Sequence, residues 1–231
     1  MDLRTTGLCF AAVVLMATSF VYGIKFLKKR NYLIGLEWWV VTLSATNLLI
    51  YFSSGAQVSY HISYFLDAFS RGFGIPVIAT AGLLVLTHGY KPSRLADILL
   101  FVAGFAVAAI LMSADFVMKV KPYLYVVMFT GFSIYLAYFI KRLVIAGEKL
   151  HAIGMAIGLV SCQTIASIYD FYKIPGEETN VVFNFLFLAL LTWSYFATEL
   201  YYAYCALERA ESASGNTARL ASSGARWIQQ P

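Results

Sequence analysis

Seven apolar stretches, each about twenty residues long, constrain this chain more than any other feature of its sequence. They lie near residues 7–27, 32–53, 61–88, 95–114, 122–142, 151–172 and 180–207. A helix of about twenty residues crosses a hydrocarbon core of about 30 Å and satisfies its own backbone hydrogen bonds. Charged residues make up 13% of the chain, roughly half of the share usual in soluble domains. We therefore expect an all-α integral membrane protein with seven transmembrane helices.

The basic residues of the connecting segments alternate in number along the chain. Twelve lie on one side of the predicted bundle: Lys25, Lys28, Lys29, Arg30, Lys91, Arg94, Lys141, Arg142, Lys149, Arg209, Arg219 and Arg226. Four lie on the other side: Arg4, Lys119, Lys121 and Lys173. Because Lys-rich and Arg-rich loops stay in the cytoplasm, this predicts the N-terminus outside and the C-terminus inside a plasma or bacterial inner membrane.

Residues 208–231 differ in composition from the rest of the chain. They are rich in Ser, Ala, Gly and Arg and lack the apolar periodicity of a packed helix. We expect a flexible cytoplasmic tail after a single transmembrane domain over residues 1–207.

Two parts of the chain show local similarity. Tyr22-Gly-Ile-Lys and Tyr138-Phe-Ile-Lys close the first and fifth helices, and an Ile-Gly pair opens the next helix in each case. This suggests a 3+1+3 parallel repeat of residues 7–88 and 122–207, joined by a linker helix at 95–114. Common membrane residues also produce such matches by chance, so both interpretations stay open.

The 3+1+3 plan resembles that of SWEET-type and PQ-loop carriers, and microbial rhodopsins share a similar plan. The resemblance is architectural only, because the chain has no Pro-Gln loop motif and lacks the proline pattern of SWEET carriers. The predicted last helix, FLFLALLTWSYFATEL, contains no lysine that could form a retinal Schiff base.

A charged pair interrupts the third apolar stretch, in HISYFLDAFSRGFGIP. Asp67 and Arg71 lie one helical turn apart, and charges at membrane depth persist where they pair or face a protein interior. The pair is either a structural ion pair between helices or an outer gate, and the Arg71 guanidinium could also bind the carboxylate of a ligand. Asp170 is a rival ion-pair partner for Arg71. Gly72, Gly74 and Pro76 follow at once and predict a weakened helix.

Other polar side chains fall at different depths of the bundle. We predict a substrate-binding site between helices 2, 3, 6 and 7 that contains Asn47, Gln163, Thr164, Trp193 and Asn184. The amides alternatively serve only as interhelical hydrogen bonds, worth about 0.6 kcal/mol each.

Two acidic side chains, Glu37 and Glu199, are candidates for proton coupling because burial favours a neutral carboxyl group. Alternatively, Glu37 lies at headgroup level beside Trp38 and Trp39, and Glu199 bonds to the tyrosines that follow it.

The remaining reactive side chains do not form known catalytic or metal-binding motifs. The three histidines and three cysteines lack HxxxH, HExxH and CxxC spacing, so we expect no metal and no cofactor. The chain has no phosphate-binding loop after a strand and no nucleophile elbow, so we do not expect an enzyme. Expected partners are the lipid bilayer, a small-molecule ligand and a second copy through AGFAVAA at 103–109, but no nucleic acid.

These features favour a transporter of a small solute, because the short loops leave little surface for a large partner. The alternative is a seven-helix receptor or sensor subunit without a retinal lysine, which the tail favours. A third possibility, an intramembrane enzyme acting on lipid, lacks a catalytic constellation.

Overall fold

The computed structural model describes residues 3–91, 93–113, 115–172 and 184–227, and this part of the chain consists of helices joined by short turns, with no strand. The helices are α1 (Leu3–Lys28), α2 (Tyr32–Ser54), α3 (Gln57–Phe69), η1 (Ser70–Ala79), α4 (Thr80–Thr87), α5 (Arg94–Ser113), α6 (Asp115–Ile145), α7 (Lys149–Ile168) and α8 (Phe185–Trp227). Because α3, the π-helix η1 and α4 follow without a break, they form one helix over residues 57–87, which we call helix three.

Six helices in the described residues are long and apolar enough to cross a membrane: Leu3–Lys28, Tyr32–Ser54, Gln57–Thr87, Arg94–Ser113, Lys119–Ile145 and Lys149–Ile168. The seventh predicted span corresponds to the first part of α8, in which Ser194, Glu199 and several tyrosines dilute the apolar residues. Its status as a membrane span, like the predicted repeat and orientation, stays a prediction. Lys173 and residues 114, 180–183 and 228–231, which belong to the predicted loops, spans and tail, lie outside the described residues.

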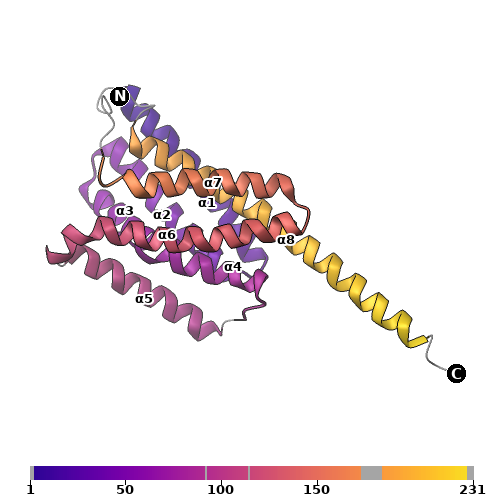
Figure 1. The fold of residues 1–231 in the computed structure, drawn as a ribbon. Coiled ribbons are helices and arrows are strands. Elements are labelled where there is room, and N and C mark those ends of the chain that lie inside the picture. The colour runs from indigo at the N-terminus through magenta and orange to yellow at the C-terminus, as the bar shows by residue number, and fades with distance from the viewer. Residues whose placement is uncertain (1–2, 92, 114, 173–183, 228–231) are drawn as a thin grey trace.

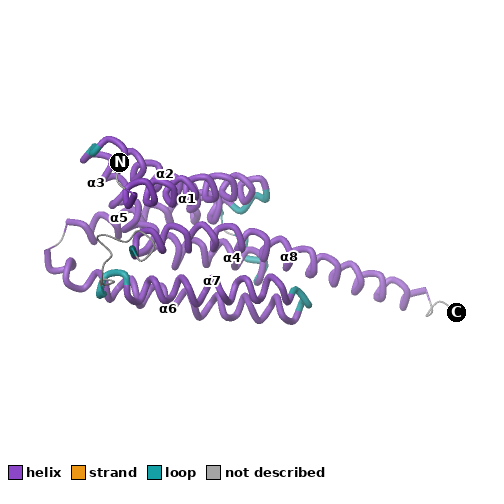
Figure 2. Tube along the Cα trace, turned by 90° about the horizontal axis from the view of Figure 1, so that it is seen from above, coloured by secondary structure: helices purple, strands orange, loops and turns teal. Residues whose placement is uncertain are grey.

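The helices form a closed bundle in which most neighbours in sequence are neighbours in space (Figure 1). α1 packs against α2 and α8, α2 against helix three, and α7 against both α6 and α8. The turns gather at two ends of the bundle (Figure 2). We call the end that carries the N-terminus and the α2–α3 turn the N-terminal end, and the other the C-terminal end.

α5 lies at the edge of the bundle, against helix three and α6. Its Gly104 faces the rings of Phe69 and Phe73, where a Cβ would come within 2.5 Å of Phe69, and Ala108 is also buried. These two small residues therefore serve packing within the chain. The proposed contact with a second copy rests on the exposed Ala103 and Ala106 and stays a prediction.

Helix three changes its winding where the sequence predicts a weak helix. Pro76 lies inside η1 and supplies no N–H group, and its ring would collide with the carbonyl of Gly72 in a regular α-helix. The wider π-type turn accommodates the proline while the helix continues.

The outer faces of the bundle carry many exposed apolar side chains, as expected for surfaces that contact lipid. They include Phe10, Val13, Leu43, Ile50, Val58, Leu95, Ile98, Val102, Val127, Ile134, Ile153 and Val160. The core contains large buried rings instead, with Phe26, Trp38, Phe132, Phe139 and Phe196 almost fully covered.

The segment predicted to be a flexible tail, residues 208–231, begins as a continuation of α8. α8 continues past Leu207 to Trp227 and projects beyond the other helices (Figure 1). Ala, Glu and Arg favour helix, and Glu208 and Glu211 form ion pairs with Lys29 and Arg142. The first turn of this segment is therefore fixed to the bundle, a contact that apolar periodicity does not reveal.

The close contact of α1 with α2 depends on two glycines. A Cβ at Gly35 would lie 2.7 Å from the Leu27 side chain and 3.0 Å from its backbone nitrogen, and one at Gly23 would lie 2.6 Å from Trp39. Backbone atoms cannot move aside as a flexible side chain can, so neither position tolerates a larger residue without separating the helices.

We predict that Gly35→Ala lowers the free energy of unfolding by about 1–3 kcal/mol, because the added methyl group overpacks the α1–α2 contact. The matched control is Gly131→Ala in α6, where a Cβ meets nothing within 4 Å. There the higher helix propensity of alanine should leave stability unchanged or raise it by up to about 1 kcal/mol. Thermal unfolding of the two variants in detergent checks this; equal shifts would contradict the predicted contact.

Candidate functional site

A cavity of about 390 Å³ enters the bundle and is lined by α1, α2, helix three, α6, α7 and α8. Its lining includes the early turns of α3, α6 and α8 and the residues that follow α7, so it opens at the N-terminal end. Leu15 of α1 and Ile75 of helix three, each near the middle of its helix, line its deeper part. We call this cavity the vestibule. Its volume lies within the usual range of small-molecule sites.

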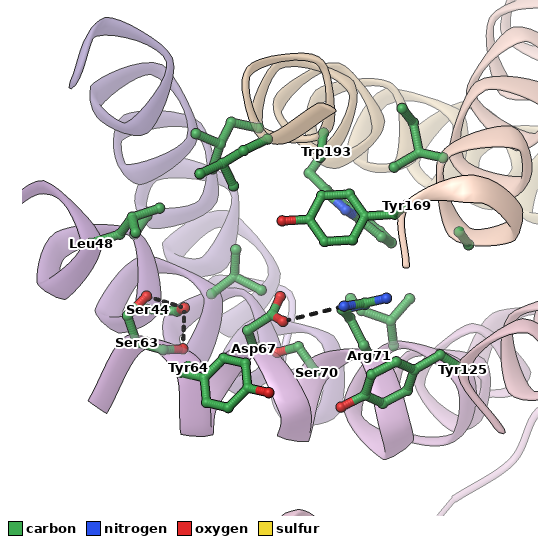
Figure 3. A pocket seen from close by; sticks show the side chains of 18 of the residues that line it. Ser44, Leu48, Ser63, Tyr64, Asp67, Ser70, Arg71, Tyr125, Tyr169 and Trp193 are labelled. Atoms are coloured by element: carbon green, nitrogen blue, oxygen red, sulfur yellow. Dashed lines mark hydrogen bonds and ion pairs between the residues drawn. The ribbon is translucent and has the colours of Figure 1, made fainter. Parts of the chain in front are cut away.

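Arg71 is the central charged group of the vestibule. Its guanidinium forms an ion pair with Asp170, which follows α7, and its Nη1 lies 3.6 Å from Oδ2 of Asp67. Figure 3 shows Asp67 and Arg71 pointing toward each other along the vestibule wall. The Arg71 and Asp170 side chains are 18% and 22% exposed, whereas Asp67 is 47% exposed. Arg71 is thus balanced by two carboxylates, of which Asp67 is the more accessible.

Tyrosine rings surround these charges. The guanidinium carbon of Arg71 lies 4.2 Å from the ring centre of Tyr125 and 5.0 Å from that of Tyr169. Across the mouth, Lys121 Nζ donates to the Tyr64 hydroxyl at 2.5 Å. Cations placed over aromatic faces are stabilised electrostatically. Two acidic and two basic side chains therefore share the vestibule, with aromatic groups between them.

The deeper wall of the vestibule is apolar and ends on a layer of rings. Trp193 packs against Phe129 and Phe196 at centroid distances of 5.5 and 5.8 Å. Phe196 in turn contacts Trp38 and Phe132, at 6.3 and 6.0 Å. We call the buried rings of Trp38, Phe132 and Phe196 the aromatic floor. They come from α2, α6 and α8 and close the vestibule toward the C-terminal end.

Glu37 lies beside this floor, one residue before Trp38, with no exposed surface. Its carboxyl group packs on Gly74 of η1, near the middle of helix three. α2 turns Glu37 and Trp38 into the bundle, so neither side chain is exposed on the lipid-facing surface as a residue of an aromatic belt would be. The depth of the two residues in the membrane stays a prediction. Only Trp39 is partly exposed and stacks on Phe20.

Ion pairs connect helices at the C-terminal end. Arg142 of α6 contacts Glu211 of α8 at 2.5 Å and donates to the Thr87 carbonyl at 3.0 Å, and Lys29 pairs with Glu208. Burial disfavours the Lys29 ammonium, but the hydrogen bond to Glu208 and nearby charges outweigh this, so the pKa of Lys29 lies above its usual value. Both basic side chains therefore remain charged near neutral pH and hold α8 to the bundle.

The structure brings only one of the five predicted substrate-binding side chains, Trp193, into the vestibule. Asn47 donates to the Leu43 carbonyl of its own helix, and Thr164 is exposed. Gln163 bonds Ser133, Thr130 and Ser167 between α6 and α7. Asn184 caps α8, accepting from the backbone of Leu186 at 3.0 Å. The sequence position of a residue indicates its depth in the membrane, but it does not indicate which way the helix turns its side chain. Residues predicted at similar depth therefore face different directions and do not form one site.

Glu199 lies outside the vestibule, in the contact between α7 and α8. Its Oε1 is 2.9 Å from Nδ1 of His151, and a Cβ at Gly154 would lie 2.6 Å from its carboxyl carbon. The hydrogen-bond partner of Glu199 is therefore a histidine of α7 and not one of the tyrosines that follow Glu199 in the sequence. Its predicted role in proton coupling stays a prediction.

Several residues that line the site were not predicted from the sequence. Ser70 and Tyr169 are adjacent in sequence to Arg71 and Asp170, which is a signal that could have found them. Tyr125 carries no such signal, because nothing in its neighbourhood distinguishes it from the other tyrosines. Asn31 caps α2 and also donates to the Gly82 carbonyl at 2.8 Å.

Comparison of the chain with known protein families, with curated proteins and with solved structures finds no match. In the described part of the chain, no three His, Cys, Asp or Glu side chains come together as a set of metal ligands.

We predict that Asp170→Asn is more destabilising than Asp67→Asn. The first change removes the closer partner of a largely buried guanidinium and should cost about 1–3 kcal/mol. The second removes a longer, half-exposed contact and leaves Asp170 in place, so its cost should stay below about 1 kcal/mol. Thermal unfolding in detergent compares the two; a larger loss for Asp67→Asn would reverse the assigned order of partners.

Proposed function

We propose that this protein is a membrane transporter of a small organic solute, in a conformation open at its N-terminal end. The observation that supports this most is the vestibule, which runs from one end of the bundle to its middle and stops at the aromatic floor. A carrier works with a central site that is open to one side at a time, and such sites commonly lie near the membrane midplane.

The lining favours a solute with a polar end and an apolar body. Asp67, Arg71 and Lys121 offer charged partners near the mouth, and Trp193 with Leu190 offers an apolar surface deeper inside. Because Asp170 adds a second acidic side chain to balance the two basic ones, a zwitterionic or neutral polar group suits the mouth better than a highly charged one. With the predicted orientation, the solute enters from outside the cell.

Release to the other side requires two changes. The rings of Trp38, Phe132 and Phe196 have to separate, and the ion pairs that hold α8 at the C-terminal end have to open. Both barriers involve α8, which also carries Trp193 in the vestibule. Movement of this one helix would therefore couple the solute site to the far gate.

A second candidate, a receptor or sensor subunit, is favoured by the length of α8. This helix runs without a break from the vestibule past the bundle to Trp227. A ligand that shifts its first half would move the projecting half, which is a simple way to pass a signal across a membrane.

The test begins with a panel of amino acids, organic amines and small carboxylates added to the detergent-purified protein, with thermal unfolding as the readout of binding. Solutes that stabilise the protein are then offered to proteoliposomes, and their uptake is measured. Binding followed by saturable uptake supports the transporter. Binding without uptake supports the receptor, and the absence of both overturns the vestibule as a ligand site.

We predict that Trp193→Ala weakens binding of the stabilising solute by about tenfold or more, since an aromatic side chain in a buried site often contributes over 1.4 kcal/mol. The matched control is Trp39→Ala, because Trp39 is partly exposed on the outside of α2 and lines no part of the vestibule. Equal losses in the two variants would place the solute elsewhere.

A further inference from the structure

The carboxyl group of Glu37 is the most isolated polar group of the described bundle. It has no exposed surface, and neither oxygen has a hydrogen-bond partner among the described residues. No ion pair in this part of the chain includes it. A buried carboxylate normally has a cation or several donors around it, so this arrangement requires an explanation.

The surroundings of Glu37 are shaped to hold it. Gly74 of η1 faces the carboxyl group so closely that any side chain there would collide with both oxygens. Ser70, four residues earlier, lies close enough to interact with the carboxyl group, but its hydroxyl makes no hydrogen bond of normal geometry within the described residues. Ser70 is at the same time part of the vestibule lining. The serine therefore lies between the buried acid and the solvent-accessible cavity.

Charged groups on the helices packed against α2 are engaged elsewhere. On α1, Lys25 lies over the rings of Tyr22, Tyr201 and Tyr202. On helix three, Asp67 and Arg71 interact with each other, and Arg71 with Asp170. α4 has no titratable side chain.

The other titratable groups of these helices are Arg4, Cys9 and Lys28 on α1 and Tyr60, His61 and Tyr64 on α3. They belong to the first two turns or the last turn of α1, or to the first three turns of α3, whereas Glu37 packs on Gly74, beyond the end of α3. Within the described residues, Glu37 has no ion-pair partner, so no cation in that part of the chain compensates a negative charge on it.

An ionised carboxylate without a partner is strongly disfavoured in an apolar interior, whereas a neutral carboxylic acid is tolerated far better. We propose that Glu37 is a proton-binding site that exchanges its proton with the vestibule past the Ser70 hydroxyl. In this conformation the group is a neutral acid. On release, the O–H bond of Glu37 breaks, the proton passes to water in the vestibule, and a carboxylate is left behind.

Release of the proton from Glu37 requires the π-helix η1 to move. A carboxylate at Glu37 needs water or a donor, and the space is closed by Gly74, so η1 has to move away from α2 when the proton leaves. η1 also carries Arg71 and Ile75, which line the vestibule. Loss of the proton is thereby linked to the shape of the vestibule.

Infrared spectroscopy of the protein without added solute tests the site directly. The wild-type protein at neutral pH should show the C=O stretch of a protonated carboxylic acid, and Glu37→Gln should lose it. The control Glu199→Gln should keep the band, because Glu199 has His151 as a partner. If Glu37→Gln does not fold, Glu37→Asp replaces it and should shift the band. A spectrum unchanged by either Glu37 variant overturns the proposal.

The exchange route is tested by the rate at which the same band shifts after transfer to D₂O. Ser70→Ala should slow this shift several-fold, while Ser44→Ala, a change at another vestibule serine that is bonded to Ser63, should not. Equal rates in the wild-type protein and both variants would overturn the route past Ser70. Both measurements omit a solute, so their outcome is independent of whether the protein proves to be a transporter.

Discussion

The pairing of Arg71 is the interaction on which the vestibule depends. A guanidinium at membrane depth stays there only when its charge is compensated, and here Asp67, Asp170 and two tyrosine rings surround it. These partners come from helix three, from α6 and from the chain that ends α7. Satisfying one charge therefore fixes the relative positions of three helices. The same groups that stabilise the cation form a polar wall around a space large enough for a small molecule.

The π-type turns of helix three contact both the vestibule and the buried carboxyl group of Glu37. Arg71 and Ile75 line the vestibule, while Gly74 meets Glu37 on the opposite helix. Pro76 prevents a regular α-helix at this point, and π-type turns often occur where a helix has a functional role. A proton on Glu37 and a solute near Arg71 would thus act on one short segment.

Sequence reasoning predicted the parts of this structure that depend on composition and local spacing. The apolar stretches correspond to helices, Pro76 marks the altered turn, and Asp170 was recognised as a rival partner of Arg71. The binding set of Asn47, Gln163 and Thr164 did not come together, because hydrophobicity gives the depth of a residue but not the direction in which its helix turns it. The same limit hid the His151 partner of Glu199 and left the burial of Glu37 as one of two alternatives, since each depends on a contact between distant segments.

The two ends of the bundle use charges in different ways, and this difference favours a gate over a rigid brace at the C-terminal end. The side chains of Lys29, Glu208, Arg142 and Glu211 are all partly exposed. Ion pairs in such surroundings contribute about 0–1 kcal/mol, because water competes for both partners. Breaking them is therefore inexpensive, whereas separating Arg71 from its carboxylates inside the vestibule is not. If α8 moves, the contacts that open first are those at the C-terminal end, and the aromatic floor is then the remaining barrier between the vestibule and the far side.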